Sequence, residues 1–71
     1  MDYSALLTDE QKKAILEQRI NQFAIEAYQH QINKELAASM GNEEGVQVAE
    51  DALATLDQAI TIHQDELAKL G

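Results

Sequence analysis

Apolar side chains in the second half of the chain recur at alternating intervals of three and four residues, and no break interrupts the pattern. The row consists of Val46, Ala49, Leu53, Leu56, Ile60, His63, Leu67 and Leu70. A 3.5-residue repeat of this kind keeps one stripe of an α-helix facing a partner helix. A similar row, with polar residues at two places, runs through the first half: Leu16, Ile20, Phe23, Ala27, His30, Lys34 and Ala37. The sequence therefore predicts two long helices that pair along these two rows, which we call the seam.

The signals that begin and end helices agree with this pattern. Thr8 is followed three residues later by Gln11, a spacing typical of a capping box, and two acids between them suit the positive end of a helix dipole. The chain has no proline, and its first glycine is Gly41, which can adopt the left-handed conformation of a helix terminus. We therefore expect the first helix to span residues 9–40.

Asn42 is well placed to cap a second helix, which we expect over residues 43–70 after a turn at residues 41–42. Gly45 weakens the first turn of that helix, so a start at Gly45 or Val46 is the alternative. Because the turn is short and the two helices have similar lengths, we expect them to lie antiparallel.

The predicted fold class is all-α, an antiparallel two-helix hairpin with coiled-coil-like packing. Residues 8–71 form this single hairpin domain, and residues 1–7 form a short N-terminal arm. Folding about the turn sets Phe23 against Ile60, so that large side chains meet smaller ones across the seam.

The chain is short for an independently stable domain, with 71 residues and no cysteine. Chains below roughly 70–80 residues usually rely on disulfides, a metal or a partner subunit. Without cysteine, neither a disulfide nor a thiolate site can form. We therefore expect the hairpin to complete a helical bundle with partner chains, either as a homo-oligomer or in a larger assembly.

Both predicted helices also carry apolar residues that the seam leaves over, among them Ala52 and Ala59. A row of such residues at helical spacing on so short a chain favours an interface, with simple surface exposure as the alternative. The arm adds side chains that are too apolar for a free tail. The predicted protein interface consists of Tyr3, Leu6, Leu7, Ile25, Tyr28, Ile32, Leu36, Val48 and Ile62.

The charge distribution argues against several kinds of partner. A net charge of −8 opposes direct binding to nucleic acid, whose phosphates attract lysine and arginine. Residues 8–40 carry five acids and four bases, whereas residues 43–71 carry seven acids and one base. No apolar run exceeds three residues, so we expect neither a signal peptide nor a membrane span, and no membrane partner.

Few residues offer catalytic or metal-binding chemistry. His30 and His63 both fall on the seam, but antiparallel pairing separates them by roughly 15 Å along the helix axis, too far to share a metal within one chain. Sites completed across a symmetric interface, using Glu26 or Glu66, are the sharper alternative to structural seam histidines. The two serines lie in no glycine-flanked elbow. We expect no enzyme activity, no cofactor and no metal site.

The run from Leu7 to Leu16, the triplet Tyr28-Gln29-His30 and the Gly41-Asn42 turn resemble short helical-hairpin proteins of tailed bacteriophages. Some of those are small virion or accessory proteins. The resemblance spans most of the chain and implies a capsid-, neck- or tail-associated role or a small host-directed binder, located in the virion or the host cytoplasm. It assigns no functional residue.

Together these patterns favour a non-enzymatic structural or accessory subunit that binds other protein surfaces. The alternative is an acidic inhibitor or antirepressor that covers the basic surface of a regulatory or nucleic-acid-binding protein. The acids of the second helix that would serve this role are Glu50, Asp51, Asp57, Asp65 and Glu66.

Overall fold

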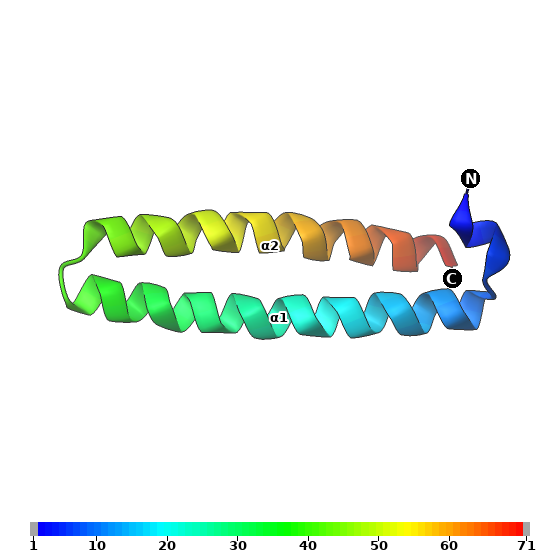
Figure 1. Ribbon diagram of the computed structural model, residues 1–71, viewed down its shortest axis with the longest axis horizontal. Coiled ribbons are helices and arrows are strands. Elements are labelled where there is room, and N and C mark those ends of the chain that lie inside the picture. Colours follow the sequence, from blue (N-terminus) through cyan, green and yellow to red (C-terminus); the bar gives the residue numbers. More distant parts are fainter. Residues whose placement is uncertain (1, 71) are drawn as a thin grey trace.

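The computed structural model describes residues 2–70 and shows an antiparallel helical hairpin (Figure 1). A 3-10 helix, η1 (Tyr3–Leu6), precedes the two long helices α1 (Asp9–Ser39) and α2 (Glu43–Leu70). The predicted fold class is confirmed, and both long helices begin where the sequence places them. Met1 in the predicted arm and Gly71 beyond the second helix lie outside the described residues.

The predicted capping box begins α1. The backbone N–H of Gln11 donates to the Thr8 hydroxyl oxygen at 3.1 Å, and the Thr8 N–H donates to the Gln11 side-chain oxygen at 2.9 Å. These two bonds satisfy donors that a helix start would otherwise leave unpaired. Helix α1 therefore has a defined first residue rather than a frayed one.

The turn between the helices is stabilised at both of its ends. Gly41 adopts a φ of 70°, and the N–H groups of Gly41 and Asn42 donate to Ala38 and Ala37, the pattern of a Schellman motif. Met40 caps α1, so the helix is one residue shorter than predicted. The Asn42 side chain then accepts from the N–H of Gly45 at 2.9 Å and begins α2 at Glu43, which excludes the later starts.

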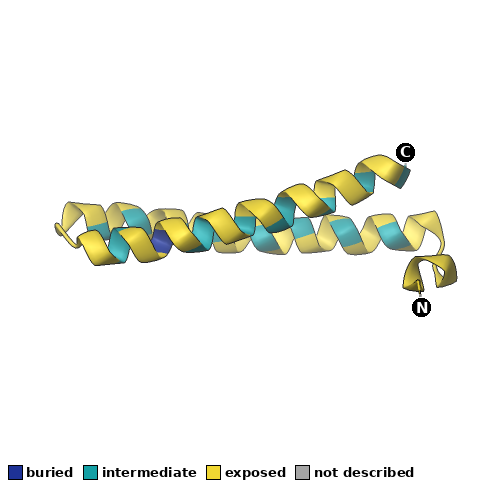
Figure 2. Cartoon of the chain, turned by 90° about the horizontal axis from the view of Figure 1, so that it is seen from above, coloured by how far each residue is buried: buried dark blue, intermediate teal, exposed yellow. Residues whose placement is uncertain are grey.

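Burial follows the seam along the facing sides of both helices (Figure 2). Every seam residue is partly or fully covered, but only Ala49, 3% exposed, is fully buried among the described residues. Ala52 and Ala59 were expected to lie off the seam, and the structure shows them half-buried beside it. Two helices therefore cover one stripe each and enclose almost no interior.

The hairpin is a rod measuring 50 × 19 × 17 Å, and both described ends of the chain lie at the end of the rod opposite the turn (Figure 1). Within residues 2–70, neither helix has a stretch apolar enough to cross a lipid bilayer.

Candidate interaction surface

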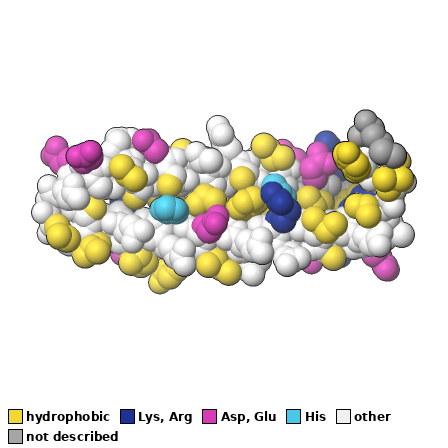
Figure 3. Space-filling view, viewed as in Figure 1, with side chains coloured by type: hydrophobic (Ala, Val, Ile, Leu, Met, Phe, Trp, Pro, Cys, Tyr) yellow, Lys and Arg dark blue, Asp and Glu magenta, His cyan; other side chains and the backbone are white. Residues whose placement is uncertain are grey.

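The outer side of α1 carries large apolar residues that no part of the hairpin covers. Ile25, Tyr28, Ile32 and Leu36 are all exposed, Tyr28 by 62%. Their spacing of three, four and four residues keeps them on the side of α1 that is turned away from the seam. We call these four residues the α1 outer row. Figure 3 shows hydrophobic side chains in a broken line along the α1 edge of the molecule.

Helix α2 exposes Val48 by 64% and Ile62 by 60%. They lie fourteen residues, or two heptads, apart and therefore on the same side of the helix. Between them on that side stand Ala52, Thr55 and Ala59, none of which carries a charge. We call these five residues the α2 side row.

The arm folds back over the open end of the hairpin. Asp2 caps η1 by accepting from the backbone N–H of Ser4 at 3.0 Å and from its hydroxyl at 2.7 Å, and these bonds lower the pKa of the Asp2 carboxyl. Tyr3 and Leu7 then line a shallow hollow of about 200 Å³ that Leu70 also borders.

The arm residues remain accessible in this position. Tyr3 is 71% exposed, Leu6 is also exposed, and Leu7 is the most covered of the three. The nine predicted interface residues are thus all exposed, but they form three separate groups: the arm, the α1 outer row and a pair on α2. That another protein covers these residues stays a prediction.

Two exposed apolar residues were missed by the sequence reasoning, namely Ile15 and Met40. Ile15 precedes the seam residue Leu16, and adjacent residues of a helix point about 100° apart, so its exposure follows from the same repeat. Met40 is the C-cap of α1 and projects from the turn, where the seam rows do not extend.

Charged side chains follow a different distribution from the apolar rows. The acids Glu50, Asp57 and Asp65 are exposed on the sides of α2 away from the α2 side row, whereas the exposed Asp51 borders that row. One of them reaches across the seam, where Glu50 pairs with Lys34 at 3.3 Å. Near the end of α2, Glu66 accepts from Lys69 at 2.9 Å and raises the pKa of that lysine.

No family model, curated protein or solved structure matches this chain.

The polar group that best ties the helices together surrounds His63. Its Nε2 accepts from Arg19 Nε at 2.9 Å, and its Nδ1 lies 2.6 Å from the Ala59 carbonyl oxygen. The Phe23 ring meets the His63 ring edge to face at 5.0 Å, and the Arg19 guanidinium lies 5.5 Å from the centre of the Phe23 ring. Phe23 thus contacts a residue one seam position beyond Ile60, its predicted neighbour.

This arrangement gives His63 a structural role. Both of its ring nitrogens already face partners, so a metal would have to displace one of them. Among residues 2–70, no three histidine or carboxylate side chains come together as metal ligands. The predicted symmetric site with Glu66 also competes with the Glu66–Lys69 pair.

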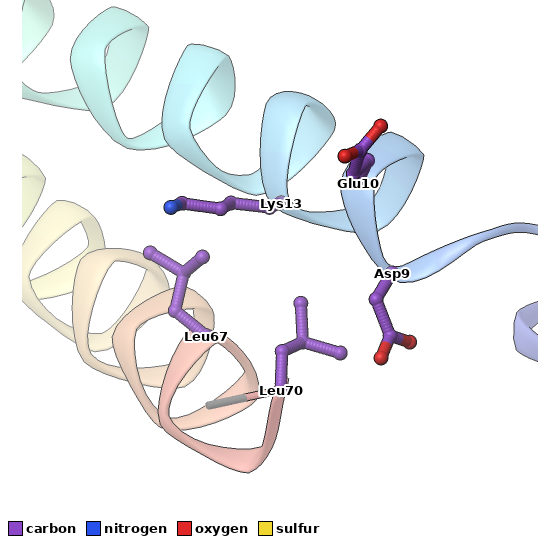
Figure 4. A pocket seen from close by; sticks show the side chains of 5 residues that line it. All are labelled: Asp9, Glu10, Lys13, Leu67 and Leu70. Atoms are coloured by element: carbon purple, nitrogen blue, oxygen red, sulfur yellow. The ribbon is translucent and has the colours of Figure 1, made fainter.

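A second hollow, at the end of the seam, brings together charged and apolar residues (Figure 4). Leu67 and Leu70 from α2 point toward α1. The Lys13 side chain extends over Leu67 and away from Leu70, the Glu10 carboxylate points away from both leucines, and the Asp9 carboxylate lies on the far side of Leu70 from the Lys13 nitrogen. The acid and base therefore do not converge on one point, which general acid–base chemistry requires. The hollow is better suited to an apolar side chain than to a reaction.

Proposed function

We propose that this protein is a non-enzymatic structural or accessory subunit that binds other protein surfaces through exposed apolar side chains. One observation carries the proposal: nearly every large apolar residue outside the seam is exposed, while Ala49 alone is fully buried in residues 2–70. A monomer this small gains little stability from such a core. A protein that covers the exposed apolar residues adds the missing apolar burial.

The α1 outer row is the part of the surface best suited to a protein partner. It extends over about three turns of helix, contains no charged residue among its four members, and includes Tyr28, a residue type enriched in interfaces. The arm supplies Tyr3 and Leu6 as further contacts at the opposite end of the rod.

Sedimentation velocity of the purified chain at low and high salt tests the proposal. Association driven by apolar contacts is expected to persist in high salt, because salt screens charges and strengthens the burial of apolar surface. A chain that is monomeric at every concentration, fully stable, and indifferent to hydrophobic surfaces contradicts it.

A second candidate function rests on the exposed acids of α2. An inhibitor that presents Glu50, Asp51, Asp57 and Asp65 to a basic protein surface would bind in low salt and dissociate in high salt. The same sedimentation experiment, with a basic protein added, separates the two candidates.

The assembly to which such a subunit belongs is suggested only by the resemblance to bacteriophage hairpin proteins. On that basis we place the protein in a virion, at the capsid, neck or tail, with the host cytoplasm as its other location. Detection of the chain in purified virions by mass spectrometry is the direct test.

A further inference from the structure

The α2 side row has the periodicity of a second coiled-coil stripe. Counted from Gly45, positions on this side of α2 recur at intervals of three and four residues as far as Lys69: Gly45, Val48, Ala52, Thr55, Ala59, Ile62, Glu66 and Lys69. The positions of this row from Gly45 to Ile62 carry no charged residue over about 27 Å. A stripe of this kind suits a second helix, and α1 occupies only the neighbouring seam.

The row also reads nearly the same in both directions. From Val48 to Ile62 its members are large, small, Thr55, small and large, with Ala52 and Ala59 as the small residues. A contact between two copies related by a two-fold axis needs this property, because residue i touches residue j while j touches i. Binding to a different protein would not require the row to be symmetric.

We propose that a second copy of this chain packs on the α2 side row, antiparallel, with the two-fold axis passing through Thr55. This contact deepens the proposed interaction function and rests on it. Val48 then lies opposite Ile62 of the second copy, Ala52 opposite its Ala59, and the two copies of Thr55 face each other.

The side chains fit a close contact. Ala52 and Ala59 have only a methyl group, so the two helices can approach closely at the centre. The Thr55 hydroxyl donates to the Asp51 carbonyl oxygen at 3.2 Å within its own helix. The second copy therefore does not need to supply a hydrogen-bond acceptor for it. Val48 and Ile62, both more than half exposed, then cover each other at the two ends of the contact.

The charges of α1 allow the same arrangement. The Lys34–Glu50 and Arg19–His63 contacts set the levels of the two helices and place Gln29 beside Thr55. The axis therefore brings Glu26 near Asn33 of the second copy.

By the same symmetry, Arg19 lies near Met40 of the second copy. No acid on this face of α1 meets an acid, whereas on α2 the axis sets Glu44 opposite Glu66 of the second copy, where Lys69, bonded to Glu66, offsets part of the repulsion. In the face shown in Figure 3, acidic side chains lie mainly toward the ends and edges, with one more near the middle.

The whole molecule measures 50 × 19 × 17 Å, so an interface of standard size needs both helices of each copy. A stable protein interface needs roughly 800 Å² from each partner. Two hairpins stacked face to face through α2 would thus form a four-helix bundle, and Ile25 and Ile32 on the outer side of α1 would stay free.

Disulfide trapping tests the contact, because the chain contains no cysteine. Thr55→Cys chains are expected to form covalent dimers rapidly under mild oxidation, since a disulfide needs Cα atoms within about 7 Å. Thr61→Cys changes the same residue type at an exposed position about 120° around α2 from Thr55, and as the matched control it is expected to react at the slow rate of random collisions. Equal rates for the two variants overturn the proposal.

Mixing variants tests the antiparallel direction. Val48→Cys chains are expected to cross-link with Ile62→Cys chains in a mixture and only slowly with themselves. Preferential self-linking of Val48→Cys would show a parallel contact and overturn the proposal.

Substitution separates this inference from the general function. Ile62→Asp is expected to convert dimers to monomers in sedimentation while the helical circular dichroism is kept, whereas Thr61→Asp, on a different side of α2, leaves the dimer intact. If Ile62→Asp chains still associate and Ile32→Asp chains do not, the α2 contact is wrong and the interaction function through α1 stands. If the unsubstituted chain does not associate and binds no protein, both are wrong.

Discussion

Arg19 donates a hydrogen bond from Nε to Nε2 of His63 at 2.9 Å, and this bond joins two helices across 44 positions of the sequence. Arginine Nε is only a donor, so His63 Nε2 accepts and its proton lies on Nδ1, which donates to the Ala59 carbonyl oxygen. The imidazole ring, the guanidinium and Phe23 thus form one contact group on the side of the seam.

A double-mutant cycle with Arg19→Ala and His63→Ala should measure the strength of this group. We expect a coupling of about 0.5–1.5 kcal/mol in the free energy of unfolding, the range of a hydrogen bond between protein groups. Urea denaturation followed by circular dichroism gives the four values. A coupling near zero would mean that Arg19 contributes only through its aliphatic stem.

Leu56→Asp should unfold the hairpin. Leu56 is a half-buried seam residue, and a carboxylate there loses solvent without gaining a partner. We expect a loss of about 3 kcal/mol or more, comparable with the whole stability of so small a chain. Gln58→Asp introduces the same charge at an exposed position and should change stability by about 0.5 kcal/mol at most.

The two internal glycines should respond differently from ordinary helix positions. Gly41→Ala is expected to cost about 1 kcal/mol, because its φ of 70° is strained for any residue with a Cβ. A Cβ at Gly45 would lie 2.8 Å from Asn42 Nδ2 and 3.1 Å from the Ala37 Cβ.

Gly45→Ala should therefore lose the stabilisation of about 1 kcal/mol that alanine normally brings to a helix. Thermal melting of both variants provides the comparison, and a clear rise in melting temperature for Gly45→Ala would show that the turn relaxes without cost.

The arm should loosen in acid. Hydrogen bonds from Ser4 hold the pKa of Asp2 below its ordinary value of 3.8. Because the pKa is lowered, the hydrogen-bonded arm has its full stabilisation above pH 3.8. This stabilisation is lost as the pH falls through the lowered pKa of Asp2. The Ser4 amide signal in NMR should shift in that range. In Asp2→Asn chains the shift should disappear, and its persistence would assign the transition to another group.

Ile32→Asp tests the α1 outer row. Ile32 lies away from both the seam and the α2 side row, so the hairpin should keep its helicity and a dimer through α2 should remain. We expect lower fluorescence of a hydrophobic dye and loss of any association beyond the dimer. Unchanged assembly in this variant would remove the outer row from the proposed interface.

Much of the fold follows from the sequence because the responsible interactions are local. The capping box at Thr8 and Gln11 needs only residues three positions apart, and Gly41 with Asn42 marks the turn by its own conformational preferences. The seam rows follow from helical periodicity alone. The exposure of the α1 outer row follows in the same way, because residues opposite a seam cannot enter it.

The tertiary structure decided the contacts that depend on how closely the two helices approach each other. It half-buried Ala52 and Ala59, gave Gly45 its close contact with Ala37, set Phe23 against His63 and joined Arg19 to His63. Periodicity assigns each residue to a side of its helix but not a distance across the gap, and the reach of a long side chain such as that of Arg19 depends on the packing around it. By itself, the sequence determined the two helices, their caps and the side that each helix buries, because these features depend on residues near in sequence. The contacts across the seam depend on how the two helices pack, so only the tertiary structure decided them.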